Sequence, residues 1–388
     1  MALLNNGTKI YLGEKLICGG NTSTGVPTPT NNKPIYINKE GQLYRQVFYD
    51  DFDKGDIDHN YWREDYMPSR VKTSYNTYSD VRCENSCLIL RCKKSMGGRD
   101  GTENGSTLAV SSIQSAVWNG MHLPNPTFHD FRPWYGLMVQ EGLFKCRAKV
   151  VAGSGIHCTL WLIGTENTSR GLKETCEIDA FEIRGNDITK VPFNQYANGD
   201  TTVTQKQVTI DCGVDLSEDF HEYTFEWSNG EYKIYIDNEL KSTLTINTPQ
   251  YPLILFLSAY RRQSGTGWTG DADNTLPDTE FYVDYLKIYK KATTMQNNEV
   301  TITSIDKIDI SFNAGNYTVN DNTGFLTNMP IYCYINWSDG SRTEHWVKWD
   351  RFDNTKKDIL DNGGTLEWEG VVYGIGTKIK ATITATVI

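Results

Sequence analysis

Long apolar runs are missing from this chain of 388 residues. No stretch approaches the ~18 consecutive apolar residues that a membrane-spanning helix needs. Residues 1–7 also lack the basic start and the apolar core of a secretory signal peptide. We therefore expect no membrane span and see no signal peptide, although a mature exported chain would already have lost its signal.

Basic charge is scarce as well. The 38 Lys and Arg residues are outnumbered by 48 Asp and Glu residues, which gives a formal net charge of −10. This balance argues against a general nucleic-acid binder and against a binder of anionic membranes. It does not exclude an acidic polysaccharide, because a local basic cleft can override the net charge.

Cysteine and histidine never occur at the spacing of a zinc site. The nine cysteines, an odd number, are Cys18, Cys83, Cys87, Cys92, Cys146, Cys158, Cys176, Cys212 and Cys333. Several stand beside apolar residues at strand positions, so we expect mostly buried, reduced thiols. Such usage suggests folding in a reducing compartment.

Sustained helical periodicity is absent too, whereas alternation with a period of two is frequent. Residues 144–150 alternate apolar with basic side chains, and residues 232–236 alternate before a turn at Asp237-Asn238. Many short strands separated by turn residues predict an all-β sandwich or jelly roll. Polar stretches at 19–34 and 291–299 read as linkers. We therefore expect an N-terminal hairpin and linker (1–44), a large β domain (45–291) and a smaller β domain (300–388).

The most informative stretch is residues 176–184, where Glu177, Asp179 and Glu182 lie among apolar side chains. In a strand, Glu177 and Asp179 point to the same face and Glu182 to the other. A β-bulge around Ala180-Phe181 would return Glu182 to the face of the other two acids.

Paired carboxylates are the working groups of glycosidases, and retaining enzymes hold them roughly 5–5.5 Å apart. Extended geometry separates the α-carbons of Glu177 and Glu182 by about 16 Å, so a bulge, sheet curvature and long side chains must close the gap. Spacing alone leaves open a strand that simply carries surface acids.

The segment Glu177-Ile178-Asp179-Ala180-Phe181-Glu182 resembles the signature of glycoside hydrolase family 16 in its bulged form, Glu-x-Asp-x-x-Glu, found in laminarinase-, agarase- and carrageenase-like members. The similarity continues in family order through residues 141–149, 159–163, 220–227, 235–237 and 281–289, and covers about residues 45–291. This resemblance implies a jelly roll of two curved sheets with a substrate cleft on the concave face.

The resemblance also implies the chemistry. Glu177 would be the nucleophile that forms a glycosyl-enzyme, Glu182 the general acid and base, and Asp179 a partner that orients Glu177. The expected reaction is retaining, endo-acting hydrolysis of a β-1,3/1,4-glucan or a galactan, without a catalytic cofactor. The alternatives are a non-catalytic glycan-binding module and a structural virion protein.

Several residues are candidates for substrate binding. Trp161 matches the cleft strand of the family, Trp118, Trp134 and Trp268 are expected to border the cleft, and Arg184 should share the face of Glu182. Each tryptophan has core packing as its alternative role, and Arg184 could merely neutralise the acids. A histidine common on the next strand in the family has no match, because residues 193–196 (Phe-Asn-Gln-Tyr) occupy that region.

Asp51 and Asp284 resemble positions near the structural calcium that many members carry, and turn capping is the alternative for Asp284. Residues 330–387 resemble a bacterial immunoglobulin-like domain, so the smaller unit is expected to be a β-sandwich whose tryptophans pack in its core. The stretch 6–13 (NGTKIYLG) resembles the start of some phage tail proteins. Virion attachment, a homo-oligomer, and action outside the cell by a virion-borne or secreted enzyme all remain open.

Overall fold

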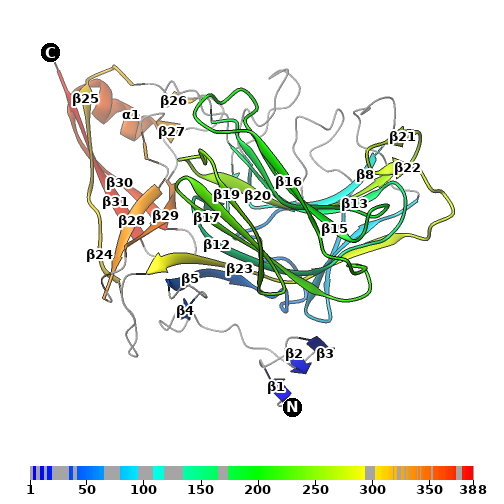
Figure 1. The fold of residues 1–388 in the computed structure, drawn as a ribbon. Helices are drawn as coiled ribbons and strands as arrows, with labels where there is room; N and C mark the ends of the chain where they lie inside the picture. Colours follow the sequence, from blue (N-terminus) through cyan, green and yellow to red (C-terminus); the bar gives the residue numbers. More distant parts are fainter. Residues whose placement is uncertain are drawn as a thin grey trace.

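The structure is a computed structural model of the chain. It describes residues 3–5, 9–12, 15–19, 35–37, 42–64, 79–94, 108–117, 134–164, 174–292, 302–317, 319–320, 325–326, 329–330, 332–338, 340, 342–350, 353–372 and 378–387. Nearly all of their regular secondary structure is β-strand, with a single short helix (Figure 1). No helix within these ranges is long and apolar enough to span a membrane.

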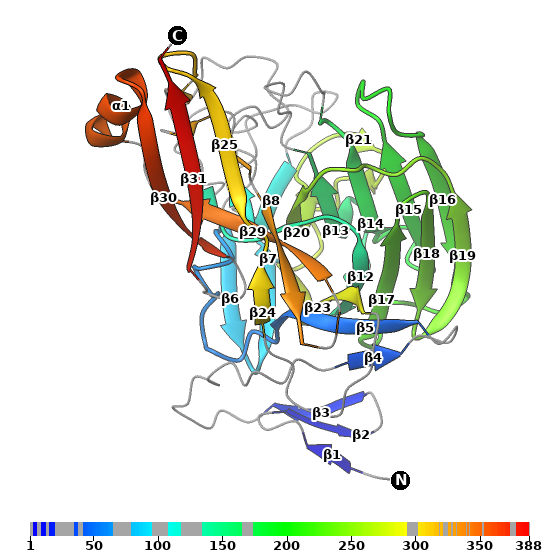
Figure 2. The same ribbon diagram turned by 90° about the vertical axis from the view of Figure 1, so that its left-hand side faces the viewer.

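One large sheet carries the acidic motif. Its antiparallel strands follow the order β11-β20-β13-β14-β15-β16, and β8 pairs with β20 on the same edge as β11, opposite β13. The strands are β8 (Leu108–Gln114), β11 (Met138–Val139), β13 (Ile156–Ile163), β14 (Glu177–Arg184), β15 (Lys190–Tyr196), β16 (Lys206–Asp211) and β20 (Leu253–Arg262). Strand β14, with the motif, therefore lies inside the sheet, where both of its edges are paired (Figure 2).

The second large sheet follows the order β19-β18-β17-β12-β23-β5-β4, with β7 also paired to β23 and β6 paired to β7. Its strands are β4 (Ile35–Ile37), β5 (Leu43–Asp50), β6 (Asp80–Glu84), β7 (Cys87–Cys92), β12 (Gly142–Lys149), β17 (His221–Ser228), β18 (Glu231–Ile236), β19 (Glu239–Thr245) and β23 (Thr279–Ala292). All of these pairs are antiparallel.

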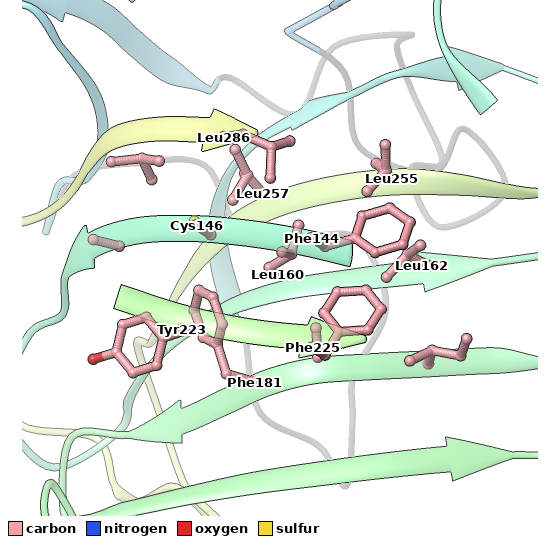
Figure 3. Packing of buried hydrophobic residues seen from close by; sticks show 14 of the residues in the cluster. Phe144, Cys146, Leu160, Leu162, Phe181, Tyr223, Phe225, Leu255, Leu257 and Leu286 are labelled. Atoms are coloured by element: carbon pink, nitrogen blue, oxygen red, sulfur yellow. The ribbon is translucent and has the colours of Figure 1, made fainter. Parts of the chain in front are cut away.

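The main core fills the space between the two sheets. Phe144 and Phe225 of the second sheet stack with their ring centroids 4.4 Å apart. Leu160, Leu162 and Phe181 of the first sheet face them in Figure 3. Side chains with a period of two supply this inner layer, because alternate strand residues point to the same face. The prediction of an all-β, two-sheet jelly roll is confirmed.

The C-terminal part forms a separate sheet with its own core, in the order β24-β28-β29-β30-β31-β25. Its elements are β24 (Ile302–Ile305), β25 (Ile308–Asn313), β28 (Tyr332–Trp337), β29 (Arg342–Trp349), α1 (Asn354–Asp361), β30 (Gly364–Val372) and β31 (Lys378–Thr386). Trp337, Trp349 and Trp368 are buried in this core, as expected for packing roles. The side chain of Trp346 lies outside the described residues. The immunoglobulin-like assignment stays a prediction.

Short pairs complete the described structure. A small three-stranded sheet of β1 (Leu3–Asn5), β2 (Lys9–Leu12) and β3 (Lys15–Gly19) contains the hairpin expected near the N-terminus. Further pairs are β9 (Ala116–Val117) with β10 (Trp134–Tyr135), β21 (Thr266–Gly267) with β22 (Gly270–Asp271), and β26 (Val319–Asn320) with β27 (Phe325–Leu326).

The described cysteines are free thiols, and all of them except Cys212 are buried. Burial raises the pKa of the Cys92 thiol to about 12. The Sγ atom of Cys92 lies 3.3 Å from the carbonyl oxygen of Ala259. The prediction of mostly buried, reduced cysteines is thus confirmed for the described residues, while the side chain of Cys18 lies outside them.

Candidate active site

A β-bulge shapes the acidic strand. In the pairing of β13 with β14, Leu160 lies opposite Phe181 and Trp161 lies opposite Asp179, so Ala180 is the extra residue. The bulge expected around Ala180-Phe181 is therefore confirmed. Because one residue is inserted, Phe181 keeps its place in the core while Glu182 returns to the face of Asp179.

Asn194 of β15 confirms that two of the acids share a face. Its Nδ2 atom donates to Oδ2 of Asp179 at 3.3 Å and to Oε2 of Glu182 at 3.4 Å. Asn194 lies directly opposite Asp179 in the antiparallel pair of β14 and β15. One neutral amide group, which has two hydrogens to donate, therefore joins two carboxyl groups.

Glu177 receives a similar contact from the turn after β15. The Nδ2 atom of Asn198 donates to Oε2 of Glu177 at 3.1 Å. The φ of Asn198 is 49°, in the left-handed region that Asn tolerates better than most residues. The local backbone conformation thus aims an amide at the first acid of the motif.

Asp179 is the most enclosed of the three acids, with 3% of its surface exposed. Burial is the main reason why its pKa lies well above the ordinary value, and the charges of Glu182 and Glu177 add to the effect, while the Asn194 hydrogen bond opposes it. Asp179 therefore holds its proton more readily than an exposed aspartate does.

Glu182 lies near the one histidine of β13. Its Oε1 atom is 3.9 Å from Nε2 of His157, and the Glu182 side chain is 22% exposed. Tyr196 also lies close enough to the acids to be affected by their charge. Burial raises its pKa to about 12, and the charges of Asp179, Glu182 and Glu177 add to this shift.

Asn194, Asn198 and His157 were not among the residues that sequence reasoning selected for the site. The period-two pattern could have pointed to Asn194, because polar positions of a neighbouring strand share the exposed face. The sequence spacing does not show that Asn194 pairs with Asp179, because the register between neighbouring strands is not a local property. For the same reason it does not show that His157 lies near Glu182.

The predicted aromatic residues separate into two environments. Trp161 is 4% exposed, stacks on Phe256 with centroids 4.3 Å apart, and donates from Nε1 to Oγ of Ser258 at 3.1 Å. Trp268 is 43% exposed. Trp161 is therefore a buried residue of the sheet, directly across from Asp179 on the neighbouring strand. Trp268, in contrast, is accessible to a ligand.

Arg184 lies beside Trp268, with its guanidinium carbon 5.6 Å from the ring centroid. Its Nη2 atom also donates to Oδ2 of Asp187 at 2.7 Å. Trp134 belongs to β10, but its side chain is outside the described residues, as is the whole of Trp118.

The two acids suggested as calcium ligands have other partners in the structure. Asp284 is completely buried and accepts from Nη1 of Arg147 at 2.8 Å, whereas Asp51 accepts from the Tyr49 hydroxyl at 2.9 Å. In the ranges that the structure describes, no group of three or more His, Cys, Asp or Glu side chains could hold a metal ion. A calcium ion needs six to eight oxygen ligands, which these two carboxylates alone do not supply, so a calcium site at Asp51 and Asp284 stays a prediction.

Comparison with known proteins adds independent information. The sequence model described as glycosyl hydrolases family 16 matches residues 137–287. A beta-glucanase of Bacillus licheniformis is 34% identical over 189 residues, which are 46% of this chain and 74% of that protein. A beta-glucanase of Paenibacillus polymyxa is 37% identical over 144 residues, which are 37% of this chain and 56% of that protein. The chain thus spans only about half the length of this second relative.

A solved structure shares the fold. It is a "GlcNAc[alpha]1-4Gal releasing endo-[beta]-galactosidase from Clostridium perfringens", with a TM-score of 0.57 and 19% identity. The match covers 88% of this chain and 90% of that chain. Such coverage exceeds what residues 1–291 could supply, so the similarity of fold extends into the C-terminal sheet.

Proposed function

The chain belongs to glycosyl hydrolases family 16, and from this premise we propose that it is a retaining, endo-acting hydrolase of a β-linked polysaccharide. The observation that carries the proposal is the bulge at Ala180, which brings Glu182 to the face of Asp179. A carboxylate nucleophile, Glu177, and a proton donor, Glu182, with Asp179 between them on the same face, match the needs of a double displacement.

Glu177 is the proposed nucleophile. Its carboxylate attacks the anomeric carbon, and the glycosidic oxygen leaves with the remainder of the polysaccharide. The Asn198 amide, 3.1 Å from Oε2, limits the rotation of this carboxylate. The product of this step is a covalent glycosyl-enzyme.

Glu182 is the proposed general acid and base. It gives a proton to the departing oxygen in the first step and takes one from water in the second. Asp179, whose pKa is raised by burial and by its acidic neighbours, shares a hydrogen bond with Glu182 and is placed to keep the negative charge of the trio low. Net retention at the anomeric carbon follows from the two displacements.

A β-1,3/1,4-glucan is the proposed substrate, because the relatives with the higher sequence identity bear the name beta-glucanase. A galactan is the second choice from the family resemblance. The C-terminal unit, proposed to be immunoglobulin-like, would act as a spacer, an adhesion module or an assembly surface. Attachment to a virion is a further part of this proposal, and it rests on the resemblance of residues 6–13 and of the C-terminal unit to parts of phage proteins.

A reducing-sugar screen tests the hydrolase proposal. Wild type and Glu177→Gln are incubated with β-glucans, agar, carrageenan and porphyran, and the anomeric configuration of the first product is followed by proton NMR. Hydrolysis with retention by wild type, lost in Glu177→Gln, supports the proposal. Equal activity of both forms, or inversion, contradicts it. Binding of glycans by both forms without hydrolysis favours a glycan-binding module instead.

A further inference from the structure

Two aromatic rings pack against the imidazole of His157, which lies beside Glu182. The imidazole of His157 lies almost parallel to the ring of Tyr260, with centroids 4.0 Å apart and an angle of 7° between the planes. The Trp268 ring lies 5.1 Å from the imidazole at a tilt of 53°. His157 itself is buried, with 6% of its surface exposed.

The position of the histidine follows from the register of three strands. His157 of β13 lies opposite Arg184 of β14 on one side and opposite Tyr260 of β20 on the other. Thr159, two residues later, lies opposite Glu182, so His157 and Glu182 are diagonal neighbours on one face. The imidazole therefore reaches the carboxyl group from an adjacent strand, within a rigid sheet.

Stacking restricts how the imidazole can turn. A ring that lies flat against Tyr260 and is enclosed by Trp268 keeps its edge directed along the sheet surface, which brings Nε2 to 3.9 Å from Oε1 of Glu182. This distance exceeds a direct hydrogen bond. At such a separation the ring acts through its charge and its bulk, which limit the orientations open to the carboxyl group.

We propose that His157 is a positioning residue for Glu182: held by Tyr260 and Trp268, it keeps the Glu182 carboxyl group in the orientation from which the proton is given and taken. The inference rests on the proposed role of Glu182 as acid and base. It goes beyond that role, because it assigns the control of the acid to a side chain outside the acidic motif.

The charged and polar groups around His157 and Glu182 come mainly from three strands. Glu177, Asp179 and Arg184 belong to β14, the strand of Glu182 itself. Strand β15 contributes the neutral amide of Asn194 and the phenol of Tyr196, and β20 contributes Tyr260. Asp187 is paired with Arg184 and Lys190. An imidazolium at position 157 would favour the ionised form of Glu182, whereas an apolar ring would favour the protonated form.

The first test needs no substrate, so its result does not depend on the hydrolase proposal. NMR follows the titration of the His157 ring in wild type and in Glu182→Gln. A carboxylate within 4 Å favours the imidazolium, so the midpoint should fall by about one pH unit in the variant. An unchanged midpoint would show that the two groups do not interact, and would overturn the proposal.

The second test uses the polysaccharide that the reducing-sugar screen identifies as the substrate. Glu177→Gln serves as the inactive reference. His157→Phe keeps a ring for Tyr260 but removes both nitrogens. We expect unchanged thermal unfolding, kcat about 10-fold lower, and the alkaline limb of the kcat/KM profile moved to higher pH. His157→Gln, which retains a neutral donor, should move the limb less. The control is His221→Gln on β17, where the ring nitrogen pairs with Asp237. The proposal is contradicted if the alkaline limb moves as far in His221→Gln as in His157→Phe. It is also contradicted if the limb moves in neither His157 variant.

Discussion

Arg147 and Asp284 form an ion pair that is closed off from solvent on the second large sheet. The Nη1 atom of Arg147 lies 2.8 Å from Oδ2 of Asp284, and the two side chains are 5% and 0% exposed. The Phe220 ring lies 4.8 Å from the guanidinium carbon. Arg147 supplies a counter-charge to the acid that the family resemblance associates with calcium.

Removing one partner of this ion pair should strongly destabilise the folded protein. Arg147→Met leaves a buried carboxylate without its counter-charge, which should lower the free energy of unfolding by about 3–5 kcal/mol. Urea denaturation measures the change. The matched control is Lys380→Met, which breaks an exposed pair with Glu367 and should leave stability unchanged. A similar small effect for both variants would mean that the buried pair is dispensable.

Chelation provides a separate prediction about the same region. Because Asp284 is engaged by Arg147 and the described residues contain no metal cluster, EGTA should not change the Tm of wild type. Differential scanning calorimetry with EGTA and with added calcium checks this. A lower Tm in EGTA that calcium restores would reveal a site formed with residues outside the described ranges.

The raised pKa of Asp179 predicts a stability that depends on pH. The folded protein holds this proton above the pH at which the unfolded chain releases it, so the contribution of Asp179 is fully present below its unfolded pKa and is lost as pH rises through the folded value. Urea denaturation at a series of pH values should show this decline in wild type. Asp179→Asn should weaken the decline while it lowers kcat about 100-fold. Parallel pH curves for the two proteins would contradict the assignment.

Two substitutions of Asn198 separate the effect of its side-chain amide on activity from the effect of its backbone conformation on stability. Asn198→Gly keeps a residue suited to the positive φ but removes the amide that contacts Glu177. It should reduce kcat about 10- to 100-fold at nearly unchanged stability. Asn198→Ala should lose the same activity and in addition about 1–2 kcal/mol of stability from backbone strain. Full activity in Asn198→Gly would remove the amide from the proposed mechanism.

The two tryptophans of the site should respond differently to truncation. Trp268→Ala removes an exposed ring and should raise KM about 10-fold with little effect on Tm. Trp161→Ala opens a cavity beside Phe256 and should cost about 3–5 kcal/mol of stability. Parallel kinetics and denaturation of both variants test this contrast. A stable Trp161→Ala protein with a raised KM would restore Trp161 as a substrate-stacking residue.

Much of the architecture was accessible from local patterns. The period of two in residues 144–150 places Phe144 and Cys146 in the core, as the structure confirms. The bulge was accessible for a similar reason, because only an extra residue lets Ile178 and Phe181 both face the core while Asp179 and Glu182 share the other face. Both inferences concern neighbours in the chain, whose relative directions follow from strand geometry alone.

The sequence by itself therefore determined the all-β class, the acidic strand and its bulge, since these depend on side-chain alternation within single strands. Only the tertiary structure decided which side chains surround the acids. Asn194 reaches Asp179, and His157 reaches Glu182, through the register between neighbouring strands. Arg147 meets Asp284 across 137 positions. Such contacts arise when strands pair and bury their polar groups, and the physical reason lies in the register of the whole sheet, which no local pattern specifies.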